Sequence, residues 1–163
     1  MQWLKRWWPA LVWAAVIWSF STGVFTSENT ASVIIPILHW LFPGATLHTL
    51  HFVHHLIRKS GHFIEYFVFS VLLFRGIRAG RHGTHLTWAL TTIALVACWA
   101  ALDEFHQSFV PGRTAAVSDV LLDTSGGIAA QIAVGLLTLW HGAWAKRRNE
   151  IAQSDKVETP VPD

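Results

Sequence analysis

The chain contains four apolar runs that each approach the length needed to cross a membrane as a helix, about 20 residues. They extend from Trp7 to about Thr26, from about Phe63 to Ile77, from Leu86 to about Val110, and from about Val117 to Trp144. Apolar and polar residues do not alternate anywhere for long enough to predict a strand. The pattern predicts an all-α protein in which residues 1–148 form a bundle of four transmembrane helices.

The composition agrees with a membrane protein. Of the 163 residues, 52% are hydrophobic and 13% are charged, whereas about 25% are charged in a typical soluble domain. The formal net charge is only +2, so the sequence offers no basic patch for nucleic acid and we expect no nucleic-acid partner. The single cysteine, Cys98, lies inside an apolar run and excludes a disulfide framework.

The flanking cations predict the orientation, because Lys and Arg accumulate on the cytoplasmic side of membrane proteins. Eight of them fall on one side of the predicted bundle: Lys5, Arg6, Arg75, Arg78, Arg81, Lys146, Arg147 and Arg148. Only Arg58, Lys59 and Arg113 fall on the other. We therefore expect a protein of the cytoplasmic (plasma) membrane with both termini in the cytoplasm. Residues 149–163 are polar and end in prolines, which predicts a disordered cytoplasmic tail.

Residues 33–58 differ from the four apolar runs. The first part, VIIPILHWLF, is too short to span a membrane and is expected to be broken by Pro36. The second part, LHTLHFVHHLIR, places histidines and Arg58 on one side of a helix and apolar side chains on the other. This pattern predicts an interfacial amphipathic helix on the outer face, between the first two membrane helices. The alternative is a zinc site, because His51 and His55 have the i, i+4 spacing that suits two ligands.

Polar side chains gather at the outer ends of three predicted membrane helices. Ser60 is the expected N-cap of the second helix, and Lys59 lies just before it. Near the start of the helix come His62, Glu65 and Tyr66. Glu65 lies about 15 Å of helix from Arg75, which is roughly half the thickness of the hydrocarbon core. A carboxylate at that depth needs a partner or stays protonated.

The third and fourth helices add carboxylates to the same end. Asp103 and Gln107 share a helix face at i, i+4, whereas Glu104 points away, towards the interface or another helix. Arg113 follows in a short outer loop. The fourth helix then carries Asp119 and Asp123, also at i, i+4.

The two aspartates precede a stripe of small residues on the fourth helix. Gly126, Gly127 and Ala130 permit close helix contact, so we expect both aspartates to face the bundle. Carboxylate oxygens are the ligands that hard cations prefer, so Asp119 and Asp123 are candidate ligands for Mg²⁺ or Mn²⁺. Ion pairs that merely lock helices together are the structural alternative for every residue of the set.

The motifs resemble those of the VanZ-like family of small membrane proteins. The similar segments are RKSGHFIEYFVFSVLLFR (residues 58–75) and DEFHQSFVPGRTAAVSDVLLDTSGG (residues 103–127), whereas the region before residue 58 carries no comparable signature. The family takes its name from an accessory protein of teicoplanin-type glycopeptide resistance, and its domains have been compared with lipid head-group enzymes. The resemblance implies the membrane architecture and a role in the cell envelope, without defining the chemistry.

Three functions fit the polar residues. In the first, an enzyme acts on a lipid head group or lipid-linked phosphate, by transfer or hydrolysis, in the outer leaflet. His62, Glu65, Asp103, Glu104 and Gln107 would supply the catalytic groups, and Lys59, Arg113 and Tyr66 would bind substrate. In the second, the same pocket binds a lipid, a cell-wall precursor or a glycopeptide without catalysis and contributes to antibiotic resistance. In the third, the acids mark a proton or transport pathway, although Thr91, Thr92 and Thr138 are the only further polar steps in the cytoplasmic halves of the second to fourth helices. The oligomeric state stays open.

Overall fold

The computed structural model describes residues 2–81, 86–113 and 115–158. Over these residues its regular elements are all helices, joined by turns. Five α-helices follow one another along the described chain, with a short 3₁₀ turn after the first. They are α1 (Gln2–Phe20), η1 (Gly23–Phe25), α2 (Ser27–Leu41), α3 (Leu47–Arg78), α4 (Leu86–Gln107) and α5 (Val117–Glu158). The predicted all-α class is confirmed.

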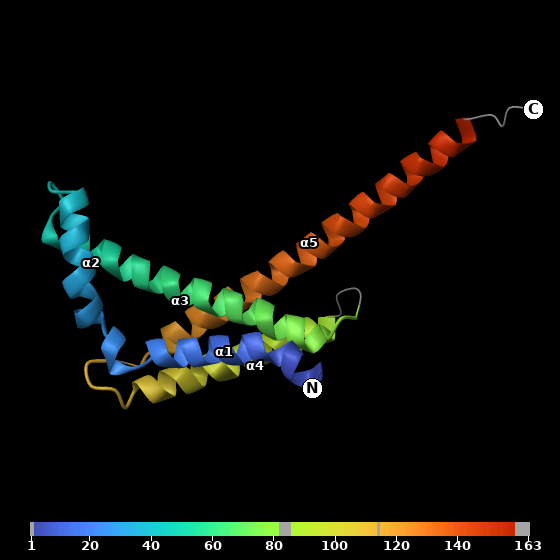
Figure 1. The fold of residues 1–163 in the computed structure, drawn as a ribbon. Helices are drawn as coiled ribbons and strands as arrows, with labels where there is room; N and C mark the ends of the chain where they lie inside the picture. Colours follow the sequence, from blue (N-terminus) through green and yellow to red (C-terminus); the bar gives the residue numbers. More distant parts are fainter. Residues whose placement is uncertain (1, 82–85, 114, 159–163) are drawn as a thin grey trace, which may run out of the picture.

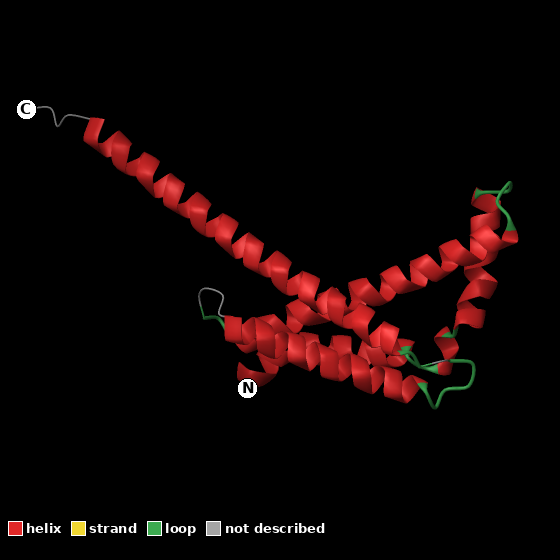
Figure 2. Cartoon of the chain, turned by 180° about the vertical axis from the view of Figure 1, so that it is seen from behind, coloured by secondary structure: helices red, strands yellow, loops and turns green. Residues whose placement is uncertain are grey.

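Four of the helices pack together and alternate in direction along the chain, and the later half of α5 projects beyond the others (Figure 1). Helices α1 and α4 run one way, and α3 and α5 run the other way. Helix α2 leaves the far end of α1, and a turn at residues 42–46 returns the chain into α3 (Figure 2). The starts of α3 and α5 and the ends of α1 and α4 are therefore found at one end of the molecule.

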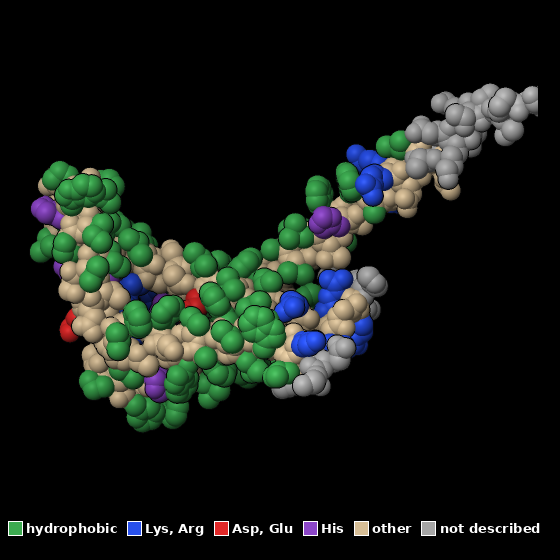
Figure 3. Space-filling view, viewed as in Figure 1, with side chains coloured by type: hydrophobic (Ala, Val, Ile, Leu, Met, Phe, Trp, Pro, Cys, Tyr) green, Lys and Arg blue, Asp and Glu red, His purple; other side chains and the backbone are tan. Residues whose placement is uncertain are grey.

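Two helical stretches are long and apolar enough to cross a membrane: Leu86–Gln107 and Val117–Ile151. Hydrophobic side chains cover much of the face in Figure 3. Leu136, Leu137 and Leu139 on α5, for example, are 57–71% exposed. Such a surface is costly in water and normal against lipid. The chain is thus compatible with a membrane, whereas the bundle of four transmembrane helices and the location of the amphipathic segment stay predictions.

The residues that precede α2 and α3 explain where these helices begin. Thr26 accepts a hydrogen bond from the backbone N–H of Asn29 at 3.2 Å, and Thr46 accepts one from Thr49 at 3.2 Å. Each hydroxyl satisfies an N–H that has no partner within its helix. Ala79, with φ 53°, and Gly80, with φ 79°, then end α3 in the left-handed conformation that closes many helices.

Two predicted helix breaks are wrong. Helix α2 continues through Pro36, although a proline inside a helix removes one backbone hydrogen bond. Ser60 is not an N-cap, because α3 begins at Leu47 and passes through Ser60 and Gly61 without interruption. A single glycine inside a helix costs only about 1 kcal/mol, so the amphipathic segment and the predicted second membrane helix form one helix.

The first and the fourth predicted membrane helices also end at other residues than predicted. Helix α1 stops at Phe20, short of Thr26, and α5 continues to Glu158. The segment predicted to be a disordered tail is therefore helical as far as residue 158, and residues 159–163 lie outside the described chain. The exposed Lys146–Glu150 pair, at 3.9 Å and with i, i+4 spacing, lies where α5 enters this segment.

The buried core joins all four long helices. Ala10, Ala14 and Ile17 of α1 pack with Tyr66, Phe69 and Leu73 of α3 and with Val96 and Ala100 of α4. Helix α5 contributes the predicted small-residue stripe: Gly126 and Gly127 are buried, and Ala130 is fully buried. A side chain added at Gly126 would lie 2.4 Å from the carbonyl oxygen of Phe63. The backbones of α3 and α5 therefore touch at this point.

We predict that Gly126→Ala destabilises the fold, because its methyl group would force the α3 and α5 backbones apart. Overpacking of this kind costs typically about 1–3 kcal/mol. Thermal unfolding of the purified protein in detergent, followed by circular dichroism, measures the effect. Gly135→Ala is the matched control, because it lies on the same helix with no atom within 4 Å of the added methyl group. Equal melting temperatures for the two variants would contradict a close contact at Gly126.

Candidate functional site

Two adjoining cavities lie at the end of the molecule where α3 and α5 begin. The first, of about 140 Å³, is lined by Ile17, Phe20, Ser21, Phe25, Thr30, Arg58, Gly61, His62, Glu65, Asp103 and Arg113. The second, of about 170 Å³, is lined by Ser27, His55, Arg58, Lys59, His62, Gln107, Gly112, Arg113 and Asp119. Three residues line both: Arg58, His62 and Arg113. The convergence of polar groups from the second, third and fourth predicted helices is confirmed.

The continuous course of α3 explains which of its side chains reach the cavities. Arg58, His62 and Glu65 are spaced i, i+4 and i+7, which places them on one stripe of an α-helix. All three line the first cavity. Arg58 is missing from the predicted site, because a helix that starts at Gly61 does not place it in register with His62. A continuous helical reading of residues 47–78 would have found it.

Helices α3 and α5 are connected by one ion pair and by the close approach of a histidine to an aspartate. Lys59 Nζ contacts Asp119 Oδ1, and both side chains are partly exposed. His62 Nδ1 lies 3.6 Å from Asp123 Oδ1, and the Asp123 side chain is completely buried. The expectation that Asp123 faces the bundle is thus confirmed. Asp123 is placed behind His62, on the side of the imidazole that carries Nδ1.

The two neighbouring acids of α4 point to different places, as their sequence positions predict. Asp103 lines the first cavity, and its Oδ2 accepts a hydrogen bond from Gln107 Nε2 at 2.8 Å. Glu104 lines neither cavity. Its Oε2 accepts a hydrogen bond from the backbone N–H of Ala116 at 2.9 Å. Glu104 therefore holds the start of α5 against the end of α4, which is a positioning role.

Both arginines of the site bind the backbone of the connection between α1 and α2. Arg113 Nη2 donates to the carbonyl oxygens of Phe20 at 2.5 Å and Phe25 at 2.8 Å. Arg58 Nη1 donates to the same Phe25 oxygen at 3.2 Å and to Thr30 Oγ1 at 2.9 Å. Burial lowers the pKa of Arg113 from its ordinary value, although an arginine stays charged in proteins. The two guanidinium groups thus give the site a fixed positive charge.

Four residues of the first cavity each have a buried polar atom without a hydrogen-bond partner in the described part of the chain. The atoms are His62 Nδ1, Glu65 Oε1, Asp103 Oδ1 and Arg113 Nε. Buried polar atoms normally have partners, because leaving one unpaired costs about 1–3 kcal/mol. A single water needs only about 10–15 Å³, so the cavity has room for several waters or a small polar group. The unpaired atoms therefore require water or another polar group in the cavity.

Of the remaining predicted residues, Lys59 and Asp119 line the second cavity, whereas Tyr66 and Asp123 line neither cavity. Tyr66 is fully buried. Its hydroxyl, like both oxygens of Asp123, has no hydrogen-bond partner among the described residues. The Lys59 ammonium contacts Asp119 Oδ1, one of the two predicted metal ligands. In the described ranges, His, Cys, Asp and Glu side chains do not gather in threes that could hold a metal, and this includes the surroundings of His51 and His55. Ligation of Mg²⁺ or Mn²⁺ by Asp119 and Asp123 stays a prediction.

These features define a helical, membrane-compatible protein with a polar site enclosed between its helices. A family model described as VanZ/LLP1 matches residues 7–139. The chain belongs to the VanZ/LLP1 family. The match begins well before residue 58, so the family pattern includes the N-terminal region that shows no signature by its motifs alone. Comparisons with curated proteins and with solved structures give no match.

We predict that Glu104→Ala destabilises the protein, whereas Glu104→Gln is much milder. Alanine removes the acceptor for the Ala116 N–H, and hydrogen bonds to charged groups contribute about 1.5–3 kcal/mol. Glutamine keeps an oxygen in a similar position. Proteolysis of the α4–α5 connection, together with thermal unfolding, measures the difference. Equal stability of Glu104→Ala and the wild type would contradict the positioning role.

Proposed function

We propose that the protein acts on a lipid head group or a lipid-linked phosphate, by transfer or hydrolysis, with its site in the outer leaflet of the plasma membrane. One observation carries the proposal: five titratable or charged residues line one small cavity, and three of them, Glu65, Asp103 and Arg113, each have a buried polar atom without a hydrogen-bond partner in the described part of the chain. A phosphate would offer acceptors to Arg58 and Arg113 and donors or water bridges to the carboxyl groups. The cavity can admit a head group and not an entire lipid.

The catalytic groups fit general acid–base chemistry. With its Nδ1 side towards Asp123, His62 can present Nε2 to the cavity as a base. Asp123 would then orient the imidazole and stabilise its charged form, as a buried carboxylate does behind other catalytic histidines. Glu65 or Asp103, in its protonated form, can act as the acid. Glu104, which binds the α5 backbone, would act only through the position of its neighbours.

In the hydrolytic form of the reaction, water attacks the phosphorus atom. A new P–O bond forms to the water oxygen, and His62 takes the proton of that water. The bond from phosphorus to the leaving oxygen breaks, and Glu65 or Asp103 donates a proton to this oxygen. In the transfer form, a hydroxyl of the acceptor takes the place of water. Arg58 and Arg113 counter the charge that develops on the phosphate oxygens.

Binding without turnover is the second candidate. The unpaired atoms require a polar occupant but do not by themselves require a reaction. A lipid, cell-wall precursor or glycopeptide held in the cavities would be withdrawn from other reactions, which agrees with the resistance phenotype that the family resemblance implies. In this case the two arginines would be more important than His62.

We predict that expression of the wild type changes the level of a lipid or lipid-linked precursor, and that Asp103→Asn and His62→Gln abolish the change. Loss of a general base lowers a rate by roughly 10²–10⁴. Mass spectrometry of membrane lipids at matched protein levels gives the measurement. Glu28→Gln and His39→Gln are matched controls, because both residues are exposed on α2 and line neither cavity.

Identical lipid profiles for the wild type and the site variants would contradict catalysis. Binding would then be tested by measuring saturable retention of lipid-linked precursors or glycopeptide, with Arg58→Gln expected to weaken retention. If neither turnover nor retention is observed, both candidates are overturned, and the polar residues serve as structural ion pairs.

The orientation gives a separate prediction. In a Cys98→Ser background, Pro111→Cys should react with a membrane-impermeant maleimide added outside intact cells, because Pro111 is exposed in the α4–α5 connection. Asn149→Cys on the exposed end of α5 should react only after the membrane is permeabilised. The opposite pattern would place the site on the cytoplasmic side.

A further inference from the structure

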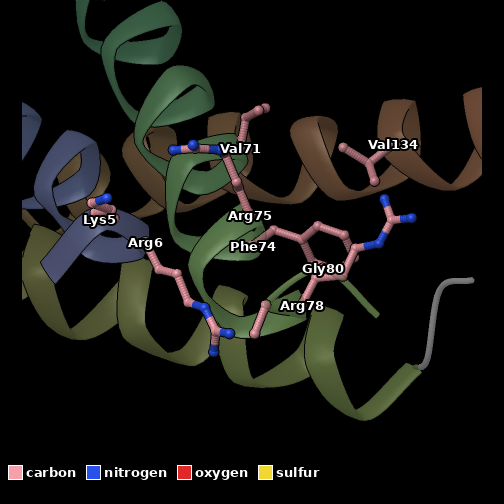
Figure 4. Close-up of a pocket in the computed structure, with 9 residues that line it drawn as sticks. Lys5, Arg6, Val71, Phe74, Arg75, Arg78, Gly80 and Val134 are labelled. Carbon is pink, nitrogen blue, oxygen red and sulfur yellow. The ribbon is translucent and has the colours of Figure 1, made fainter. Parts of the chain in front are cut away.

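A third and larger cavity lies at the opposite end of the molecule from the candidate site. It has a volume of about 570 Å³ and is lined by Lys5, Arg6, Val71, Phe74, Arg75, Arg78, Ala79, Gly80 and Val134. Its walls come from the start of α1, the end of α3 and the middle of α5 (Figure 4). The proposed reaction uses none of these residues.

The lining is strongly cationic. Four of its nine residues are Lys or Arg, and none is Asp or Glu. In the described part of the chain, none of these four cations is paired with a carboxylate. Arg78 Nε donates to the carbonyl oxygen of Arg81 at 2.5 Å, which fixes one guanidinium group at the edge of the cavity. Lys and Arg side chains also gather at this end in Figure 3.

The rest of the lining is apolar. Val71 and Phe74 of α3 and Val134 of α5 form the wall beside the cations. Leu137, at i+3 from Val134 on the same side of α5, is exposed, so the apolar wall continues into the hydrophobic surface of the helix. A cavity with cations at one edge and hydrocarbon at the other matches the two parts of a phospholipid.

We propose that this cavity binds the phosphate head group of an anionic phospholipid, with the upper part of an acyl chain against Val71 and Val134. Basic pockets between membrane helices recognise such head groups through charge-assisted hydrogen bonds. A free phosphate would use the cations but not the apolar wall. The site requires the membrane setting and is independent of the reaction proposed at the other end.

The test is native mass spectrometry of the full chain in an uncharged detergent, titrated with phosphatidylglycerol or with phosphatidylcholine of the same acyl chains. We expect saturable binding that favours phosphatidylglycerol. Glycerol 3-phosphate and inorganic phosphate, added as competitors, should displace the lipid poorly. Arg75→Gln combined with Arg78→Gln should weaken binding of phosphatidylglycerol by about fivefold per cation, or about 25-fold in total.

The matched control is Lys146→Gln combined with Arg147→Gln, which removes the same charge from exposed positions on α5 that do not line the cavity. Its affinity should change less than twofold. Lys5→Gln combined with Arg6→Gln provides a second pair of lining cations whose side chains are exposed, in case loss of the Arg78 contact disturbs the end of α3.

Three results would overturn the proposal. Equal affinity for phosphatidylcholine would remove the role of the charge. Equal loss of affinity in the control pair would show that the effect depends on net charge and not on the cavity. Displacement of the lipid by millimolar glycerol 3-phosphate would identify the ligand as a soluble phosphate.

Discussion

The contact between α3 and α5 determines where the other functional groups lie. The two helices run in the same direction, and their contacts follow in order along both helices: Lys59 with Asp119, His62 with Asp123, and Phe63 with Gly126. Farther along, Ser70 Oγ donates to the Gly127 carbonyl at 3.0 Å and Gln131 Nε2 donates to Ser70 Oγ at 2.8 Å. Because Gly126 lacks a side chain, the backbones approach closely enough for the short aspartate side chains to reach α3.

The two ends of the molecule differ in which charged side chains they contain and in how these are paired. At the candidate site, acids and cations are mixed, partly buried and linked to the backbone, so that helix ends and loops are fixed by the same groups that surround the cavity. At the other end, the cations of the large cavity have no carboxylate among its lining. A site that mixes acids and cations suits chemistry on a bound group, whereas a purely cationic site suits attraction of an anionic surface.

Much of the site follows from helical periodicity. Asp103 with Gln107, and Asp123 with the small residues that follow it, have their predicted faces because their helices are regular and their starts are marked. The divergence of Asp103 and Glu104 is equally local, since adjacent helical positions point about 100° apart. Arg58 was missed because a serine followed by a glycine resembles a helix start, although neither residue prevents a helix from continuing.

The sequence by itself determined the helical class, the apolar surface and the end of the molecule where polar side chains gather, because these depend on residue type and on a period of 3.6 residues. Tertiary structure alone decided which polar atoms have partners on other segments. The binding of Arg113 to the Phe20 and Phe25 carbonyls and of Glu104 to the Ala116 N–H joins segments that are 12 to 93 residues apart. Contacts over such separations depend on how closely the helices pack, and periodicity within one helix carries no information about that distance.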